Sequence, residues 1–152
     1  MSRLKGRVLP EDLLRCISQT GLPFEEVILM LTVDAEALPH VAMLSHWELF
    51  APDERTIRAA TYLGSRTSNN LLRDGKVTLV FVNETMSYYV KGDARLTRER
   101  MSSDSSNSLF TITVAQVYED VLEGAAIKTG ITFSKTSGTE PHEALFLELV
   151  AG

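Results

Sequence analysis

The hydrophobic pattern of the chain predicts a protein built mainly of β-strands. Residues 27–33 and 76–82 are nearly continuous aliphatic and β-branched runs, which is typical of buried strands. Residues 86–97 alternate apolar and polar side chains, so this strand has one dry and one wet face, and Gly92 in its middle predicts a β-bulge. Shorter runs predict four further strands, at residues 40–50, 56–61, 109–117 and 124–133. The expected fold is a small barrel of six to seven largely antiparallel strands with short helices.

Two short helices interrupt this pattern, and a third segment stays ambiguous. Residues 10–17 open with Pro10 and two acids and carry leucines and an isoleucine on one face, which predicts a helix. A second helix is expected from residue 65, ending before Gly75 as its C-cap. Residues 142–150 are apolar enough to form either a strand or a helix.

Composition narrows the class of protein. A chain of 152 residues with 44% hydrophobic content can bury one core, so a single domain over residues 1–152 is expected. The formal net charge of −5 argues against a nucleic-acid partner. Cys16 is the only cysteine, which excludes an intrachain disulfide and a cysteine-based metal centre and suits a reducing cytoplasm. No apolar run approaches the length of a membrane span, so no membrane partner is expected.

A polar cluster at the start of the second helix is the strongest candidate for chemistry. Ser65, Arg66 and Thr67 stand where the first helical turn leaves its backbone N–H groups free, so they could converge on one phosphate. Asn70 follows Thr67 at i+3 on the same helix face, where it could brace the phosphate or the preceding strand. The alternative is that Ser65 or Thr67 simply caps the helix.

The three histidines give little support for a metal or hydrolytic site. No carboxylates recur at ligand spacing around His40, His46 and His142, and the chain lacks a nucleophile-elbow sequence. We therefore expect no metal and assign no catalytic residue.

Three segments resemble the FMN-binding split barrel of the pyridoxamine 5'-phosphate oxidase-like family. They read PHVAMLSHW, TIRAATYLGSRTSNNLLRDGKVTLVFV and YYVKGDARLT, and the resemblance spans about residues 25 to 98. It implies an FMN cofactor whose phosphate is held by Ser65, Arg66 and Thr67, with Thr61 at the end of the preceding strand. Thr67 departs from the basic residue usual in the family, so one positive charge is lost while a hydroxyl donor remains.

The same resemblance implies a homodimer with two FMN sites at its interface. Ser87 occupies the position from which the partner subunit contributes a polar residue. Ser45, His46 and Trp47 stand where a strand end would meet the flavin ring, although Trp47 could equally be a core or interface aromatic.

Departures from the family pattern argue against the vitamin B6 reaction itself. The strand over residues 41–47 has no Arg or Lys, and no Arg follows Arg100, so a doubly charged substrate phosphate would find few cations. The sequence therefore predicts an FMN-dependent oxidoreductase of unknown substrate, in which the flavin supplies the chemistry. Two alternatives stay open: a non-catalytic module that binds flavin or another phosphorylated ligand, and a structural dimer without cofactor.

Overall fold

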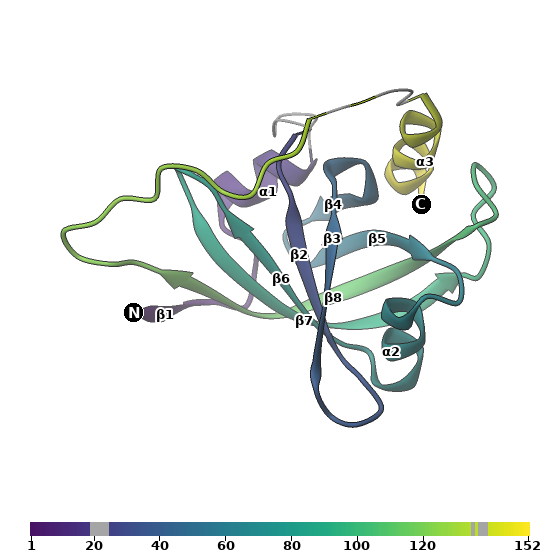
Figure 1. Ribbon diagram of the computed structural model, residues 1–152, viewed down its shortest axis with the longest axis horizontal. Coiled ribbons are helices and arrows are strands. Elements are labelled where there is room, and N and C mark those ends of the chain that lie inside the picture. Colours follow the sequence, from purple (N-terminus) through teal and green to yellow (C-terminus); the bar gives the residue numbers. More distant parts are fainter. Residues whose placement is uncertain (19–24, 135, 137–139) are drawn as a thin grey trace.

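Antiparallel strands make up most of the regular secondary structure (Figure 1) in this computed structural model, which describes residues 1–18, 25–134, 136 and 140–152. Within these residues, the strands are β1 (Ser2–Gly6), β2 (Ile28–Val33), β3 (Pro39–Leu44), β4 (Leu49–Asp53), β5 (Thr56–Tyr62), β6 (Lys76–Val82), β7 (Ser87–Arg98) and β8 (Asn107–Asp120). The helices are α1 (Glu11–Ser18), α2 (Arg66–Asp74), α3 (Glu140–Ala151) and the 3-10 turn η1 (His46–Glu48). No helix of the described part of the chain is long and apolar enough to cross a membrane.

One curled sheet forms the split barrel. Its strand order is β3-β2-β6-β7-β8-β5-β4, and β1 pairs with β8 outside this path. Side chains on the inner face of the sheet form the main core, to which α1 adds Leu13 and Ile17. Leu13, Met30, Leu79, Phe110 and Ile112 are completely shielded from solvent. Burial of such side chains is the main source of stability in a sheet of this kind.

Several local predictions are confirmed. The strands around α2 and the hairpin of β2 and β3 form as expected, and Gly75 ends α2 with a left-handed φ of 70°. The ladder between β7 and β8 shifts register between Lys91 and Gly92, which is the predicted bulge. A Cβ at Gly92 would lie 2.6 Å from the carbonyl oxygen of Thr113, so this close approach of two strands requires glycine.

The predicted strand over residues 40–50 is wrong as a single element. β3 ends at Leu44, η1 turns the chain, and β4 begins at Leu49. The turn forms because the Glu48 carboxylate accepts hydrogen bonds from the backbone N–H of Ser45, at 2.7 Å, and from its hydroxyl. The hydrogen bonds between Ser45 and Glu48 thus interrupt the strand that the apolar pattern of residues 40–50 predicts.

Two further predictions about strands were wrong, and their effects on the strand count cancel, so the eighth strand comes from the division of residues 40–50 into β3 and β4. The predicted strand over residues 124–133 is absent. This segment forms one isolated antiparallel bridge, between Thr132 near its end and Glu26. β1 was missed because its five residues are mostly polar and exposed, and its partner β8 lies more than 100 residues away in sequence.

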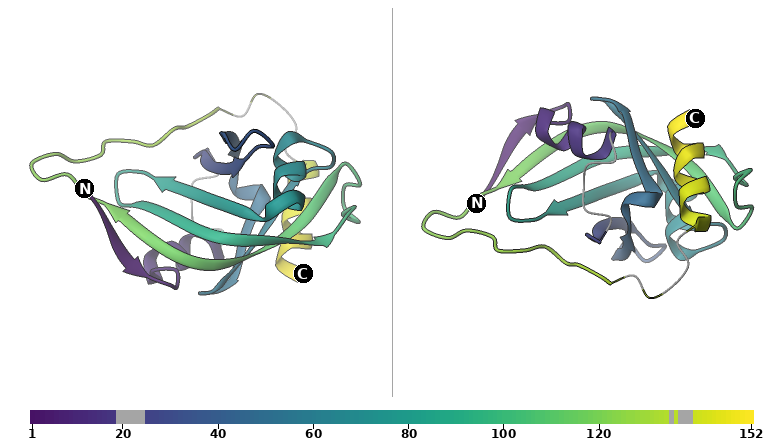
Figure 2. Two further views of the ribbon diagram at one scale, coloured as in Figure 1. Left: turned by 90° about the horizontal axis from the view of Figure 1, so that it is seen from below. Right: turned by 90° about the horizontal axis from the view of Figure 1, so that it is seen from above.

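The ambiguous C-terminal segment is a helix. Leu145 and Leu149, one turn apart on α3, are buried against Ala60 of β5 and against Met101 and Leu109, where they form a second, smaller core. On β5, Ile57 and Ala59 belong to the main core, whereas Ala60 belongs to this second core. Figure 2 shows α3 lying across β4 and β5, which it packs against together with η1.

Candidate functional site

The start of α2 has the geometry of a capped helix with two free amides. Ser65 is the N-cap, and its hydroxyl oxygen accepts a 3.1 Å hydrogen bond from the N–H of Ser68. The N–H of Asn69 closes the first turn on the carbonyl of Ser65, at 2.9 Å. The N–H groups of Arg66 and Thr67 precede any intrahelical partner and remain available to an anion. Ser65 therefore caps the helix, which is the role that the sequence analysis gave as the alternative to phosphate binding.

A network of hydroxyls fixes Thr61 behind this helix start. The Ser68 hydroxyl donates to the carbonyl of Tyr62 at 2.6 Å, which uses its only proton. Thr61 Oγ1, at 2.7 Å from Ser68 Oγ, must then be the donor of that bond. Thr61 consequently offers only lone pairs to a ligand in this arrangement. Ser68 was not singled out from the sequence, although its i+3 spacing from Ser65 is typical of a capping partner.

Arg66 and Thr67 are the uncommitted members of the cluster. Arg66 is exposed, and its guanidinium makes no hydrogen bond or ion pair with the described residues. Thr67 is only 6% exposed, yet its hydroxyl has no hydrogen-bond partner within the same part of the chain. A guanidinium, a hydroxyl and two amides at one helix start are all donors from which one phosphate can accept hydrogen bonds.

Asn70 has a structural role. Its side-chain N–H donates to Thr32 Oγ1 of β2 at 2.9 Å, and its carbonyl oxygen accepts from Arg73 at 3.2 Å. Arg73 also donates to the backbone carbonyl of Val33. These bonds brace α2 against β2 and not against β5, the strand that precedes the helix in sequence.

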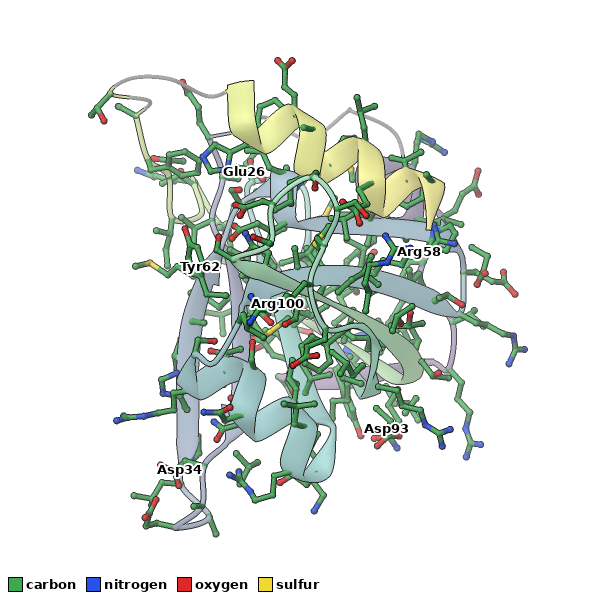
Figure 3. The ribbon with its side chains drawn as sticks, turned by 90° about the vertical axis from the view of Figure 1, so that its right-hand side faces the viewer. Glu26, Asp34, Arg58, Tyr62, Asp93 and Arg100 are labelled. Atoms are coloured by element: carbon green, nitrogen blue, oxygen red, sulfur yellow. The ribbon has the colours of Figure 1, made fainter. Side chains whose placement is uncertain are left out.

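A polar groove of about 620 Å³ runs between α2 and the turn that joins β2 to β3. Figure 3 shows Asp34 on this turn, beside α2. The groove is lined by Asp34, Ala35, Glu36, Arg66, Asn69, Asn70 and Arg73. Arg66 thus belongs both to the helix start and to the groove. Sequence reasoning did not find the acidic wall, because nothing local indicates that this turn folds onto α2.

Comparison with known proteins decides the family. The sequence model described as pyridoxamine 5'-phosphate oxidase matches residues 19–130. This chain belongs to the pyridoxamine 5'-phosphate oxidase family. The uncharacterized protein YclD of Bacillus subtilis is 29% identical over 120 residues, which cover 79% of this chain and 76% of YclD.

Several solved structures share the fold. A candidate pyridoxamine 5'-phosphate oxidase from Lactobacillus delbrueckii superposes with a TM-score of 0.61 at 16% identity, over 77% of this chain and 98% of that one. An FMN-binding protein from Syntrophomonas wolfei gives 0.55 at 13% identity, over 74% and 84%. HupZ of Group A Streptococcus gives 0.54 at 18% identity, over 67% and 89%. At these identities the likeness concerns the fold alone.

The residues expected near the flavin ring lie apart from the groove in this family member. Ser45 and His46 begin the η1 turn, which packs against α3, β4 and β5. Burial lowers the pKa of His46 to about 4, so its imidazole is neutral at pH 7. The Trp47 ring meets Phe146 of α3 edge to face, with centroids 6.4 Å apart. Trp47 therefore has a packing role under α3.

Ser87 is not brought to the helix start within one chain. It begins β7, six residues before Asp93, and Asp93 pairs with Lys76 just after α2. Its hydroxyl donates to the backbone carbonyl of Asp120. Only a second copy of the chain could place Ser87 beside the phosphate cluster. Among the described residues, no group of three or more His, Cys, Asp or Glu side chains could hold a metal ion.

Proposed function

We propose that the protein binds FMN, with the flavin phosphate at the start of α2. The observation that carries the proposal is the uncommitted Arg66 guanidinium beside the unpartnered Thr67 hydroxyl and the two free amides of the first helical turn. Ser65 supports the same site as the cap, and Thr61 and Asn70 hold the helix start in place. Membership of the family and the shared fold of an FMN-binding protein support this assignment.

Bound flavin would supply hydride or electron transfer, so we infer that the protein is an oxidoreductase. The chain's own residues would anchor the phosphate and orient the cofactor. Arg66 would provide charge, while Thr67 would provide a hydrogen bond from a site shielded from water. A carrier that stores or senses flavin would use the same anchors. Anaerobic bleaching of the bound flavin by NADH or NADPH is expected of the enzyme and not of the carrier.

FMN added to the pure protein is expected to stay bound after the excess is removed. The donors at the start of α2 are charge-assisted and partly shielded, which favours retention of a phosphate dianion. The measurement is an absorption spectrum after desalting, with riboflavin, which lacks the phosphate, as the matched control ligand. A protein that emerges colourless after FMN treatment would contradict the proposed function.

We expect the protein to be a homodimer, because the outer face of its sheet carries an apolar row across five strands. The cross-strand register aligns Met43, Leu29, Val80, Tyr89 and Tyr118. Met43 is 69% exposed on the edge strand β3, and the row alternates with side chains that point into the core. A continuous apolar row of this kind favours association of two copies. Light scattering at micromolar concentration should report twice the chain mass; a monomer would remove Ser87 from the candidate site.

FMN-loaded protein is not expected to oxidise pyridoxine or pyridoxamine 5'-phosphate at a useful rate. The segment 41–47 has no Arg or Lys, and no Arg follows Arg100, so few cations are available for a substrate phosphate. A second phosphate dianion would be repelled by the flavin phosphate by about 2 kcal/mol per charge pair at 8–10 Å and an effective dielectric of 20. Formation of pyridoxal 5'-phosphate, followed by absorbance, tests this. Turnover with a micromolar Michaelis constant would show that other cations complete a substrate site.

A further inference from the structure

The groove beside α2 continues well past the position proposed for the flavin phosphate. Arg66, Asn69 and Arg73 follow one another along its helical wall at i, i+3 and i+7. Only Arg66 belongs to the proposed FMN site. A volume of about 620 Å³ lies within the range of pockets that hold whole small-molecule ligands, so one phosphate would fill a minor part of it.

Hydrogen-bond donors extend along this helical wall beyond Arg66. Asn69 uses its side-chain amide in one bond to the carbonyl of Gly64, at 3.3 Å, which leaves further capacity for a ligand. Arg73 is held by Val33 and Asn70 and forms an ion pair with Asp74 at 3.9 Å, yet a guanidinium has five N–H donors. The wall can therefore meet a second phosphate next to the first.

The opposite wall of the groove, which the turn between β2 and β3 forms, is acidic. It therefore favours a ligand that carries hydroxyl or amino donors. Asp34 shapes the turn, since its Oδ1 accepts hydrogen bonds from the N–H groups of Glu36 and Leu38, at 3.0 and 2.9 Å. The Glu36 side chain is exposed and has no hydrogen-bond or ion-pair partner among the described residues. A free carboxylate is the group that proteins commonly use to bind the hydroxyls of a ribose. A ligand composed only of phosphates would be repelled by this wall.

We propose that the groove binds the adenylate half of a flavin adenine dinucleotide, so that the protein takes FAD in preference to FMN. The proposal rests on the proposed flavin phosphate site at Arg66. Asn69 and Arg73 would meet the second phosphate, and Glu36 would accept hydrogen bonds from the adenosine ribose. The two arginines and two carboxylates of the groove match a ligand that carries phosphates on one side and hydroxyls on the other.

The experiment compares FMN and FAD binding by flavin fluorescence and calorimetry in the full-length protein. FAD is expected to bind about tenfold more tightly than FMN, the equivalent of one hydrogen bond to a charged group. Glu36→Ala should remove this advantage and change FMN affinity by less than about twofold. Glu84→Ala, which alters an exposed acid in the turn between β6 and β7, is the matched control and should leave both affinities unchanged. Glu36 is exposed and its side chain makes no hydrogen bond or ion pair, so the variant should fold.

Each other outcome overturns the proposal in a recognisable way. FMN binding with FAD equal to or weaker than FMN removes the adenylate site and leaves the proposed function intact. Failure to bind either flavin removes both. ADP-ribose added to FMN-loaded protein is a third titration. If it binds in a Glu36-dependent manner, the groove takes the adenylate of a separate nucleotide and not that of the flavin.

Discussion

Arg66→Ala is expected to weaken FMN binding by about 10- to 100-fold, because a charge-assisted phosphate contact contributes about 1.5–3 kcal/mol. The side chain is exposed and makes no ion pair with the described residues, so its removal should leave folding unchanged. Ser65 is a poorer test, since its hydroxyl caps α2 and its loss would also destabilise the helix. Flavin fluorescence titration measures the affinity.

The matched control for this prediction is Arg95→Ala, which removes an exposed arginine of β7 that is likewise outside every described ion pair. It tests whether any loss of positive charge weakens binding through the net charge of the protein. Arg66→Lys should recover part of the affinity, because it restores the charge without the fork of donors. If Arg66→Ala binds FMN as tightly as the parent, the phosphate lies elsewhere.

The local parts of the fold could be predicted because local signals determine them. Apolar runs specified β2 and β6, and a glycine that takes a left-handed φ of 70° specified the end of α2 at Gly75. The interruption at Ser45 escaped prediction because it depends on one side chain, Glu48, folding back on the backbone three residues earlier. β1 escaped because a short polar strand is stabilised by a distant partner.

The candidate site also has some features that the local sequence determines and others that depend on residues distant in sequence. Ser65, Arg66 and Thr67 are neighbours in sequence, so their convergence at a helix start could be predicted. The role of Asn70 could not be decided, because its partner Thr32 lies 38 residues earlier. The orientation of the Thr61 hydroxyl depends on the carbonyl of Tyr62 acting through Ser68, which is a question of three-dimensional geometry. The acidic wall of the groove likewise depends on how a distant turn packs against α2.

Glu148→Gln is expected to destabilise the protein by about 2–3 kcal/mol at pH 7, because this carboxylate anchors α3 to the end of β7 and to the loop that follows β7. Glu148 accepts hydrogen bonds from the N–H groups of Ser102 and Ser103, at 2.9 and 2.7 Å, and it pairs with Arg98. An amide can accept fewer of these bonds and presents its own donors to the same groups. Urea denaturation gives the free energy of unfolding. Glu143→Gln, an exposed acid on the same helix, is the control and should change stability little.

The parent and Glu148→Gln differ in their free energy of unfolding. The pH dependence of that difference shows whether it comes from the charge of Glu148 or from the packing of its side chain. Burial raises the pKa of Glu148, but hydrogen bonds from Ser103 and Ser102 and the contact with Arg98 outweigh burial and lower the pKa to about 2 from 4.5. Because the folded-state pKa is depressed, the stabilisation is fully present above pH 4.5 and is lost as the pH falls toward 2, with an upper bound of about 3 kcal/mol. The stabilities of the parent and Glu148→Gln should therefore converge between pH 4.5 and pH 2. Every other titrating group contributes equally to the stability of both proteins, so its effect cancels in the comparison. A difference that stays constant over this range would assign the loss to packing of α3, and the carboxylate would then not be its anchor.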